Sequence, residues 1–469
     1  MMNNYVIQLD IFNEIFLFCD FITKIRFRRV CKYSYNNLHM IDFYNTENEY
    51  LTKLTDDILK NHKFIKYLNI SFNHEIYDVS WMKNLKELNA SWSEIHQMGI
   101  KGLDLIKLDV SYNRKITDLN FMKNLKELNA SGECGIDQMG INGLNLINLD
   151  ISYNKKIIDL NFMTSLKKLN VSGHSCVIGQ SQIKNLDLIA LKVKYNSKIS
   201  NVSFMTNLKE LDAGSYYCGI NQMGINGLNL IKLDVSDNPK ITDVSFMTNL
   251  KKLNACGDCG INQMGIKELD LIKLNACNNQ KITDVSFMTN LKELNASGTG
   301  IKQEGVKGLN LIKLNVQDNP NIKNISWMKN LKELDASGNC GIKQMGIKGL
   351  DLIKLEVGYY SKIMNVNFMT NLKELKISGN CGAKQLAVKA LNLINLNDRF
   401  NLNRINVNGI NLKELNNHDN YEINGLSLQI INISEMTNLK ELNFIVLNYP
   451  KNLKITWLEN LKNKIMYYF

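Results

Sequence analysis

Hydrophobic and polar residues follow one short pattern along most of the chain. Residues 105–113 read LIKLDVSYN, which fits L-x-x-L-x-L-x-x-N with valine at the third apolar position. Because alternate residues of a strand point to opposite faces, Leu108 and Val110 are predicted to enter the core. Asp109 and Ser111 are then predicted to face solvent. The pattern therefore indicates a short strand buried on one side.

The pattern recurs through about twenty units, each called a rung here and named by its first leucine or isoleucine. A Phe-Met or Trp-Met dipeptide returns every 40 to 42 residues from Trp81 to Phe368, and each interval holds two rungs. This is a leucine-rich repeat, and its units of 20 to 22 residues resemble the short internalin type. The fold class predicted is a leucine-rich-repeat solenoid with a parallel β-sheet on the concave side and short turns or single-turn helices on the convex side.

An asparagine stands eight residues after the first leucine in every second rung. It is predicted to turn inward and bond backbone groups of neighbouring rungs, each of which would cost about 1–3 kcal/mol if buried unpaired. This ladder comprises Asn73, Asn113, Asn154, Asn196, Asn238, Asn279, Asn319 and Asn401. Tyr360 interrupts it. The Phe-Met dipeptides are predicted to form a packed spine, with Phe121 and Ile141 at equivalent places.

The cysteines follow the same period. Cys134, Cys176, Cys218, Cys259, Cys340 and Cys381 occur once in two rungs. Two strand spacings are roughly 9–10 Å, beyond the ~7 Å Cα limit for a disulfide, so these residues are predicted to be buried free thiols. Cys256 and Cys277 fall at matching places in adjacent rungs and could cross-link on oxidation or share a soft metal. The favoured interpretation is two small residues without such a bond.

Composition narrows the functional classes. The 469 residues are 45% hydrophobic and 22% charged, with a net charge of +11. We find no apolar run long enough to span a bilayer and no signal-peptide pattern, so we expect a soluble, cytoplasmic protein without a membrane partner. Lysine and glutamate alternate on neighbouring strands, which disfavours nucleic acid. We find no metal-ligand spacing and no catalytic motif, so we expect a protein that is not an enzyme and holds no cofactor or metal.

The first residues do not follow the repeat. Residues 5–40 show helical spacing and are predicted to form a small α-helical domain, with 41–63 a partly helical linker and 64–460 the solenoid. The stretch IFNEIFLFCDFITKIRFRRVCKYSYNNL resembles an F-box, most clearly at Glu14-Ile15-Phe16 and Arg29-Val30-Cys31-Lys32. Gln8 and Ser34 depart from the family pattern, which has proline and tryptophan there. The alternative is a helical cap that covers the first rung.

An F-box followed by leucine-rich repeats resembles the substrate receptors of cullin-RING ubiquitin ligases, and the style resembles those of large DNA viruses. The resemblance implies that the helices bind a Skp-type adaptor while the repeats present a target protein for ubiquitination, in the host cytoplasm if the protein is viral. The adaptor contacts it implies are Ile11, Ile15, Phe16, Ile25, Phe27 and Val30. The alternative function is an interaction scaffold with no ubiquitin-ligase link.

Target contacts are predicted from departures within the repeat. The seventh residue after the first leucine, called the exit position here, is Gly, Asp, Asn or Ser in many rungs. It is aromatic at Phe72, Trp92, Tyr112, Tyr153, Tyr195, Tyr359 and Phe400. Aromatic residues at a solvent-facing edge are frequent interface hot spots. The alternative is that they stack on neighbouring rungs.

A second departure lies in rung Leu188. Lys192 and Lys194 replace the usual Asp or Asn and Ser, and the next rung carries an inserted residue beside Ser215, Tyr216 and Tyr217. Lysines next to tyrosines make a local basic, aromatic surface. We therefore expect an acidic or phosphorylated segment of the target to contact this stretch.

Overall fold

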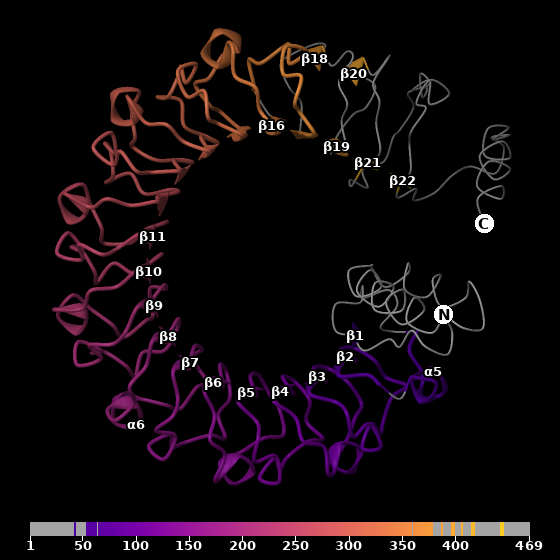
Figure 1. The fold of residues 1–469 in the computed structure, drawn as a ribbon. Helices are drawn as coiled ribbons and strands as arrows, with labels where there is room; N and C mark the ends of the chain where they lie inside the picture. The colour runs from indigo at the N-terminus through magenta and orange to yellow at the C-terminus, as the bar shows by residue number, and fades with distance from the viewer. Residues whose placement is uncertain are drawn as a thin grey trace, which may run out of the picture. The chain divides into compact units, whose positions relative to one another are not determined.

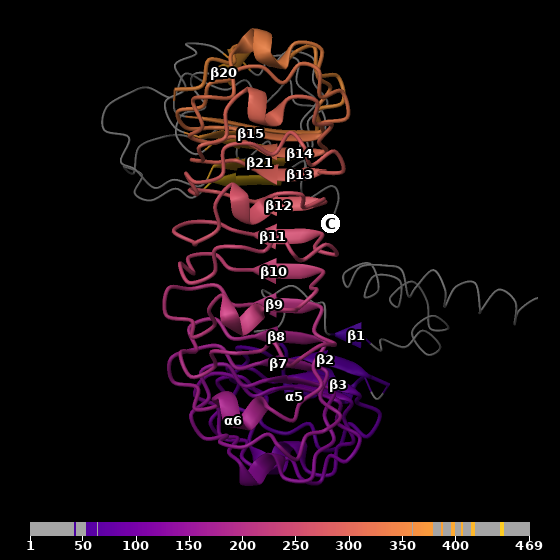
Figure 2. The ribbon, with the colours of Figure 1, turned by 90° about the vertical axis from the view of Figure 1, so that its left-hand side faces the viewer.

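The computed structural model describes residues 42–43, 53–62, 64–358 and 360–378, together with the short strands β18 to β22. The chain divides into two compact units, residues 1–275 and 276–469. Within each unit, successive rungs place their strands side by side in parallel (Figures 1 and 2). Each unit is therefore a parallel β-solenoid, as the repeat predicts.

The first unit contains one strand per rung, preceded by a short strand that the sequence pattern did not predict. The strands are β1 (Asp42–Phe43), β2 (Tyr67–Asn69), β3 (Glu87–Asn89), β4 (Lys107–Asp109), β5 (Glu127–Asn129), β6 (Asn148–Asp150), β7 (Lys168–Asn170), β8 (Ala190–Lys192), β9 (Glu210–Asp212), β10 (Lys232–Asp234), β11 (Lys252–Asn254) and β12 (Lys273–Asn275). In the second unit they are β13 (Glu293–Asn295), β14 (Lys313–Asn315), β15 (Glu333–Ala336), β16 (Lys354–Gly358), β17 (Glu374–Ser378), β19 (Asn395–Asp398), β21 (Glu414–Asn417) and β22 (Glu441–Phe444). Two further strands, β18 (Leu386–Ala387) and β20 (Ile405–Asn406), pair with each other in a separate two-stranded sheet.

Helical turns face away from the strands in each unit (Figure 1). They are α5 (Asp56–Lys60), α6 (Gln180–Ile183), η1 (Gln97–Ile100), η2 (Met139–Ile141), η3 (Met223–Ile225), η4 (Met264–Ile266), η5 (Glu304–Val306) and η6 (Gln344–Ile347). Helix α5 lies in the predicted linker, where the Thr55 side chain accepts a bond from Ile58 N at its start. The F-box-like segment 5–40 lies outside the described residues.

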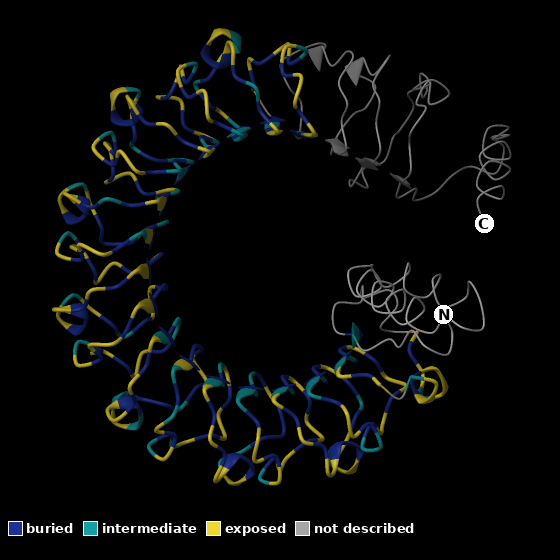
Figure 3. Cartoon of the chain, in the orientation of Figure 1, coloured by how far each residue is buried: buried dark blue, intermediate teal, exposed yellow. Residues whose placement is uncertain are grey.

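The core lies between the strands and the outer turns (Figure 3). Leu105, Leu108 and Val110 of one rung are at most 1% exposed, and the equivalent residues of the other described rungs are similarly buried. A single rung cannot enclose its own apolar edge, so each is stabilised by its neighbours.

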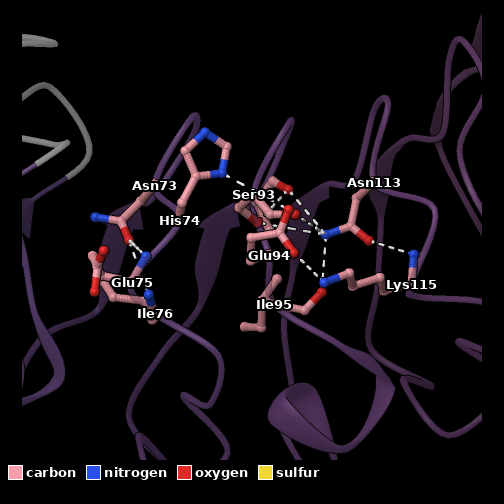
Figure 4. A network of polar contacts seen from close by, with 10 residues as sticks. Asn73, His74, Glu75, Ile76, Ser93, Glu94, Ile95, Asn113 and Lys115 are labelled. Atoms are coloured by element: carbon pink, nitrogen blue, oxygen red, sulfur yellow. Dashed lines mark hydrogen bonds and ion pairs between the residues drawn. The ribbon is translucent and has the colours of Figure 1, made fainter.

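The asparagine ladder is confirmed in the described rungs. The Nδ2 of Asn113 donates to the carbonyl oxygens of Ser93 (3.2 Å) and Ile95 (3.0 Å) in the preceding rung, and its Oδ1 accepts from Lys115 N (2.9 Å; Figure 4). The buried members are Asn73, Asn113, Asn154, Asn196, Asn238, Asn279 and Asn319. Buried Ser361 follows the interruption at Tyr360, and Asn401 lies outside the described residues.

Glutamines join the outer turns, a feature that the sequence analysis missed. The Oε1 of Gln97 accepts from Thr117 N and Asp118 N (both 2.9 Å), while its Nε2 donates to Asp118 O (2.7 Å). From the following rung Gly140 approaches so closely that a Cβ would lie 2.1 Å from Thr117 O. Glutamine and glycine therefore hold one loop from both sides. The same glutamine bonds recur at Gln180, Gln222, Gln303 and Gln344.

Two predictions need correction, one about the Phe-Met dipeptides and one about a pair of cysteines. In the Phe-Met dipeptides only methionine is buried: Met122 is 0% exposed and Phe121 is 38% exposed. Met122, one residue beyond Phe121, thus takes the inward place in its rung that Ile141 takes in the next. The prediction had assigned this buried place to Phe121. Cys256 and Cys277 are each disulfide-bonded, so the favoured interpretation of two unbonded residues was wrong.

The predicted free thiols are confirmed at Cys134, Cys176, Cys218, Cys259 and Cys340, whereas Cys381 lies outside the described residues. The Sγ of Cys134 donates to Ala130 O (3.0 Å) and lies 3.4 Å from Asn154 Nδ2. Burial raises the pKa of the Cys218 thiol to about 11. A thiol with this pKa is neutral and unreactive at neutral pH, which fits a packing role.

Candidate binding surface

The exit position adopts a left-handed backbone in nearly every described rung. Trp92 has φ 53°, Tyr153 has φ 60° and Asp237 has φ 54°. The same backbone bond accompanies this conformation in each case, since Trp92 N donates to Ser111 O and Asp237 N donates to Cys256 O. The repeat therefore imposes one backbone geometry on very different side chains.

This geometry suits some residues far better than others. Glycine adopts it freely, and asparagine and aspartate tolerate it, whereas other residues are disfavoured by roughly 1–2 kcal/mol. The five aromatic residues that nevertheless occupy it in the first unit are called the aromatic row here. They are Phe72, Trp92, Tyr112, Tyr153 and Tyr195. Backbone strain held at a repeated surface position needs a cause other than the fold itself.

Rings of the aromatic row lean onto the following rung. Phe72 and Trp92 are stacked with ring centroids 6.1 Å apart, and Trp92 and Tyr112 are stacked at 4.4 Å. Offset stacking of this kind contributes about 0.5–1.5 kcal/mol per pair. The alternative considered from the sequence, stacking on neighbouring rungs, is therefore confirmed for Phe72, Trp92 and Tyr112.

Glycine occupies the next exit position after Tyr112 and after Tyr153, whereas Ser215 occupies it after Tyr195. A Cβ on Gly132 would lie 2.6 Å from the Tyr112 ring, and one on Gly173 would lie 2.6 Å from the Tyr153 ring. These two glycines thus permit both the left-handed backbone and the ring above it. Aromatic residue and following glycine form one packing unit.

Stacking leaves much of each ring in solvent. Trp92 remains 49% exposed and Tyr153 44% exposed. Tyr195 is more covered, because His174 lies against it with ring centroids 5.2 Å apart and also contacts Tyr217 at 5.3 Å. The first unit therefore carries a partly exposed aromatic edge that ends in a His-Tyr cluster.

Lysines flank this cluster. Lys194 places its Nζ 5.7 Å from the centroid of the Tyr195 ring, within cation-π range. Lys192, at the end of β8, stands in register with Asp212 of β9. Burial, followed by the charge of Asp234, raises the pKa of Asp212, and both lysines oppose that shift. Part of the predicted basic surface thus faces a carboxylate of the same sheet.

The structure brings most of the predicted target contacts onto one unit. Trp92 and Tyr112 are in direct contact, and Lys194, Tyr195 and Tyr217 gather around His174. Tyr359 lies outside the described residues. The predicted adaptor contacts also lie outside them, namely Ile11, Ile15, Phe16, Ile25, Phe27 and Val30.

Sequence reasoning missed two parts of the surface. Phe72 was recognised as an exit-position aromatic but not selected as a contact, although it continues the stack to Trp92. His174 gave no signal in the sequence, because its neighbours come from the two following rungs. The repeat period is enough to put Phe72 at an exit position. The position of His174 beside Tyr195 and Tyr217 is known only from the structure.

The surface combines aromatic rings with polar donors and lysines. Within the described ranges, no group of three or more His, Cys, Asp or Glu side chains could hold a metal ion. The same part of the chain contains no helix of sufficient length and apolar character to cross a membrane. Exposed rings, phenol and indole donors and lysines are the groups that the surface offers to a ligand.

No protein-family model and no curated protein matches the sequence. Among solved structures, the functional domain of InlJ from Listeria monocytogenes is similar at 17% identity and a TM-score of 0.32, with 73% of this chain and 65% of that chain covered. This chain thus spans just under two thirds of that domain.

Two further solved structures are similar to this chain. A leucine-rich-repeat protein of Leptospira interrogans matches at 17% identity and a TM-score of 0.32, with 78% of this chain and 95% of that chain covered. The mouse RP105/MD-1 complex matches at 15% identity and a TM-score of 0.37, with 81% and 77% covered.

Proposed function

We propose that this protein is a non-catalytic interaction scaffold whose first unit binds a partner protein along the aromatic row. One observation carries the proposal: aromatic side chains occupy a left-handed exit position that Asp, Asn, Gly or Ser fills in the other described rungs. The rings keep a large exposed fraction despite that strain. Aromatic residues that bring large area at little entropic cost are frequent interface anchors.

Photo-crosslinking of the full chain tests the proposal. A photoreactive phenylalanine analogue replaces Tyr112 or Trp92 in cells, and the same analogue at Asp318 serves as the control. The partner identified in this way is then purified and its affinity measured. We expect Trp92→Asn with Tyr112→Asn to weaken binding at least tenfold, about 1.4 kcal/mol. Equal affinity of this variant and the parent would overturn the proposal.

A finer function rests on the N-terminal sequence. The resemblance of residues 5–40 to an F-box supports a substrate receptor that binds a Skp-type adaptor in the cytoplasm and presents the partner for ubiquitination. In this version the aromatic row and the Lys192 and Lys194 surface hold the target, and the adaptor contacts lie within residues 5–40. The scaffold function does not depend on it.

Adaptor binding is tested separately on the full chain. We expect a complex with purified Skp-type adaptor that is lost in the variant Ile15→Asp with Phe16→Asp. Trp92→Asn serves as the matched control and leaves the adaptor complex intact. If the parent forms no complex at concentrations of tens of micromolar, where even weak interfaces are detected, the ubiquitin-ligase link is removed.

A further inference from the structure

At its first three residues, Phe72, Trp92 and Tyr112, the aromatic row presents ring edges more than ring faces. Trp92 is stacked on Phe72 with one interplanar angle of 10° and on Tyr112 with another of 16°, so both of its faces are occupied. Aromatic rings carry negative charge on their faces and positive charge at their edges. A ligand that reaches this part of the row therefore meets partial positive charge together with indole N–H and phenol O–H donors.

Ligands that need free ring faces fit this arrangement poorly. Bases of single-stranded nucleic acid bind by stacking on exposed aromatic faces along a strongly basic groove. Proline-rich segments likewise dock between exposed rings. The rings of Phe72, Trp92 and Tyr112 are stacked on one another. The row favours a ligand rich in hydrogen-bond acceptors.

The charges next to the row point the same way. Glu94 lies two residues after Trp92 and forms an ion pair with Lys115 (Figure 4). Its Oε1 also lies 3.8 Å from His74 Nδ1. Glu133 follows Gly132 and forms an ion pair with Arg114. These carboxylates of the edge are therefore neutralised by their own partners.

Carboxylates on the adjoining strands are also engaged. Asp109 accepts bonds from Ser111 and Asn129, and Asp150 accepts bonds from Ser152 and Asn170. Asp212 accepts a bond from Gly214 N and faces both lysines.

Some cations along the row lack such a partner. Among the residues that the structure describes, no ion pair within 4.0 Å involves Lys155, Lys192 or Lys194. Lys155 lies two residues beyond Tyr153 and is exposed, and Lys194 directly precedes Tyr195. Exposed Lys155, and Lys192 and Lys194 beside Asp212, are therefore the cations that the row offers to a ligand.

From this geometry we infer that the aromatic row binds an extended, acidic peptide segment of the partner. The inference rests on the proposed function and names the chemistry of its ligand. Rungs Ile65 to Leu188 cover six strand spacings, about 29 Å, which an extended segment of roughly nine residues spans. Carboxylate or phosphate groups of the segment accept from Lys155 and Lys194, and its backbone and apolar side chains contact the ring edges of Trp92 and Tyr112.

Selection from a peptide library tests this inference without a known partner. The full chain selects from displayed random peptides of about twelve residues, long enough to span the row. We expect the selected peptides to be enriched in Asp and Glu, and their binding to weaken with salt. Synthetic copies are then measured by fluorescence anisotropy, with a charge-reversed peptide and a uridine oligonucleotide as competitors.

Two variants and one control locate the binding. Trp92, Tyr112 and Tyr153 are each replaced by Asn, a residue that the chain itself uses at this backbone position in Asn278. Lys155 and Lys194 are replaced by Glu in the second variant, and Asp318→Asn is the control. We expect about tenfold or greater loss of affinity in both variants and none in the control, as for charge-assisted contacts. Circular dichroism confirms that the variants are folded.

The outcomes separate this inference from the proposed function. Peptides that depend on the row but are neutral or basic would overturn the acidic ligand and leave the scaffold function standing. Stronger competition by the oligonucleotide would replace the peptide with a nucleic acid. Binding that is indifferent to both variants would remove the row as a binding surface and with it the proposed function.

Discussion

Two regions of the molecule use the same exit-position backbone for different purposes. In the second unit Asp318 has φ 51°, and its Oδ1 accepts a bond from Asn339 N at 2.8 Å in the next rung. In the first unit Trp92 has φ 53° but bears a side chain that caps no backbone group and remains 49% exposed. Asp318 is what the repeat needs for stability. Trp92 lacks this stabilising bond, and in the proposed function its exposed ring serves partner binding.

The comparison shows how a repeat can separate folding from recognition. A left-handed position every twenty or so residues is an inherent part of each rung, and the short polar residues that suit it best contribute one hydrogen bond, about 1 kcal/mol, across rungs. Rungs that carry a ring instead lose that bond and gain exposed aromatic area. Stacking on the next rung offsets part of the loss.

The largest effect is expected at Gly132. Gly132→Ala adds a Cβ at φ 69° that would lie 2.6 Å from the Tyr112 ring. We expect the free energy of unfolding to fall by about 2–3 kcal/mol, from backbone strain of ~1–2 and overpacking of about 1. Urea denaturation measures it, with amide exchange in the neighbouring rungs as a local probe.

Gly227→Ala is the matched control, because Gly227 has φ 76° and a Cβ added there would meet nothing within 4 Å. It isolates the backbone strain, roughly 1–2 kcal/mol. If Gly132→Ala costs no more than this control, the ring does not lie over Gly132. In the background of Tyr112→Asn the two alanine variants should become equal, which is the double-mutant form of the same test.

A smaller effect is expected when the second unit is given a ring. Asp318→Tyr removes the bond to Asn339 N and places a bulky residue at φ 51°. We expect destabilisation of about 1–2 kcal/mol by urea denaturation. Asp318→Asn keeps the accepting oxygen and should stay close to the parent. A fully stable Asp318→Tyr variant would mean that the aromatic row is not strained.

The sequence predicts the scaffold well and the surface only in part. Leu108, Val110 and Asn113 were placed correctly because the same spacing recurs along the chain, so that many rungs support one assignment of inward and outward residues. The exit-position residues Trp92 and Tyr112 were found as departures from that spacing. Their left-handed backbone was not predicted, since it follows from the turn rather than from the aromatic residue.

Other features depend on distances between rungs that no single rung encodes. The Phe-Met dipeptide offers two apolar residues, and the pattern could not decide that Met122 rather than Phe121 faces inward. His174 contacts Tyr217 in a loop lengthened by one inserted residue, while the strand of that rung keeps its register with both neighbours. Contacts that arise from such an insertion have no periodic signal.

The end of the aromatic row provides a test by pH. Burial and the charge of Asp234 raise the pKa of Asp212 above its ordinary value of 3.8. The folded state then binds its proton more tightly than the unfolded state, so ionisation costs stability as pH rises through the raised pKa. We expect Asp212→Asn to be more stable than the parent by on the order of 1 kcal/mol at pH 7. The gain should disappear as pH falls toward 4, and urea midpoints across this range measure it. If Asp212→Asn gains the same stability at pH 7 and near pH 4, the gain comes from packing and not from the ionisation of Asp212.

The smallest effect is expected at Tyr153, and it separates strain from stacking most directly. Its ring lies over Gly173 and stacks on no other ring among the described residues, whereas Trp92 is stacked on two. Tyr153→Asn therefore relieves the left-handed strain with little loss of contact, and we expect the free energy of unfolding to rise by about 0.5 kcal/mol or to stay unchanged. For Trp92→Asn we expect the free energy of unfolding to be lower than that of the parent by about 1 kcal/mol, because two stacked pairs are lost. Urea midpoints measured side by side decide the order of the two variants. The reverse order would show that stacking does not offset the left-handed strain at Trp92.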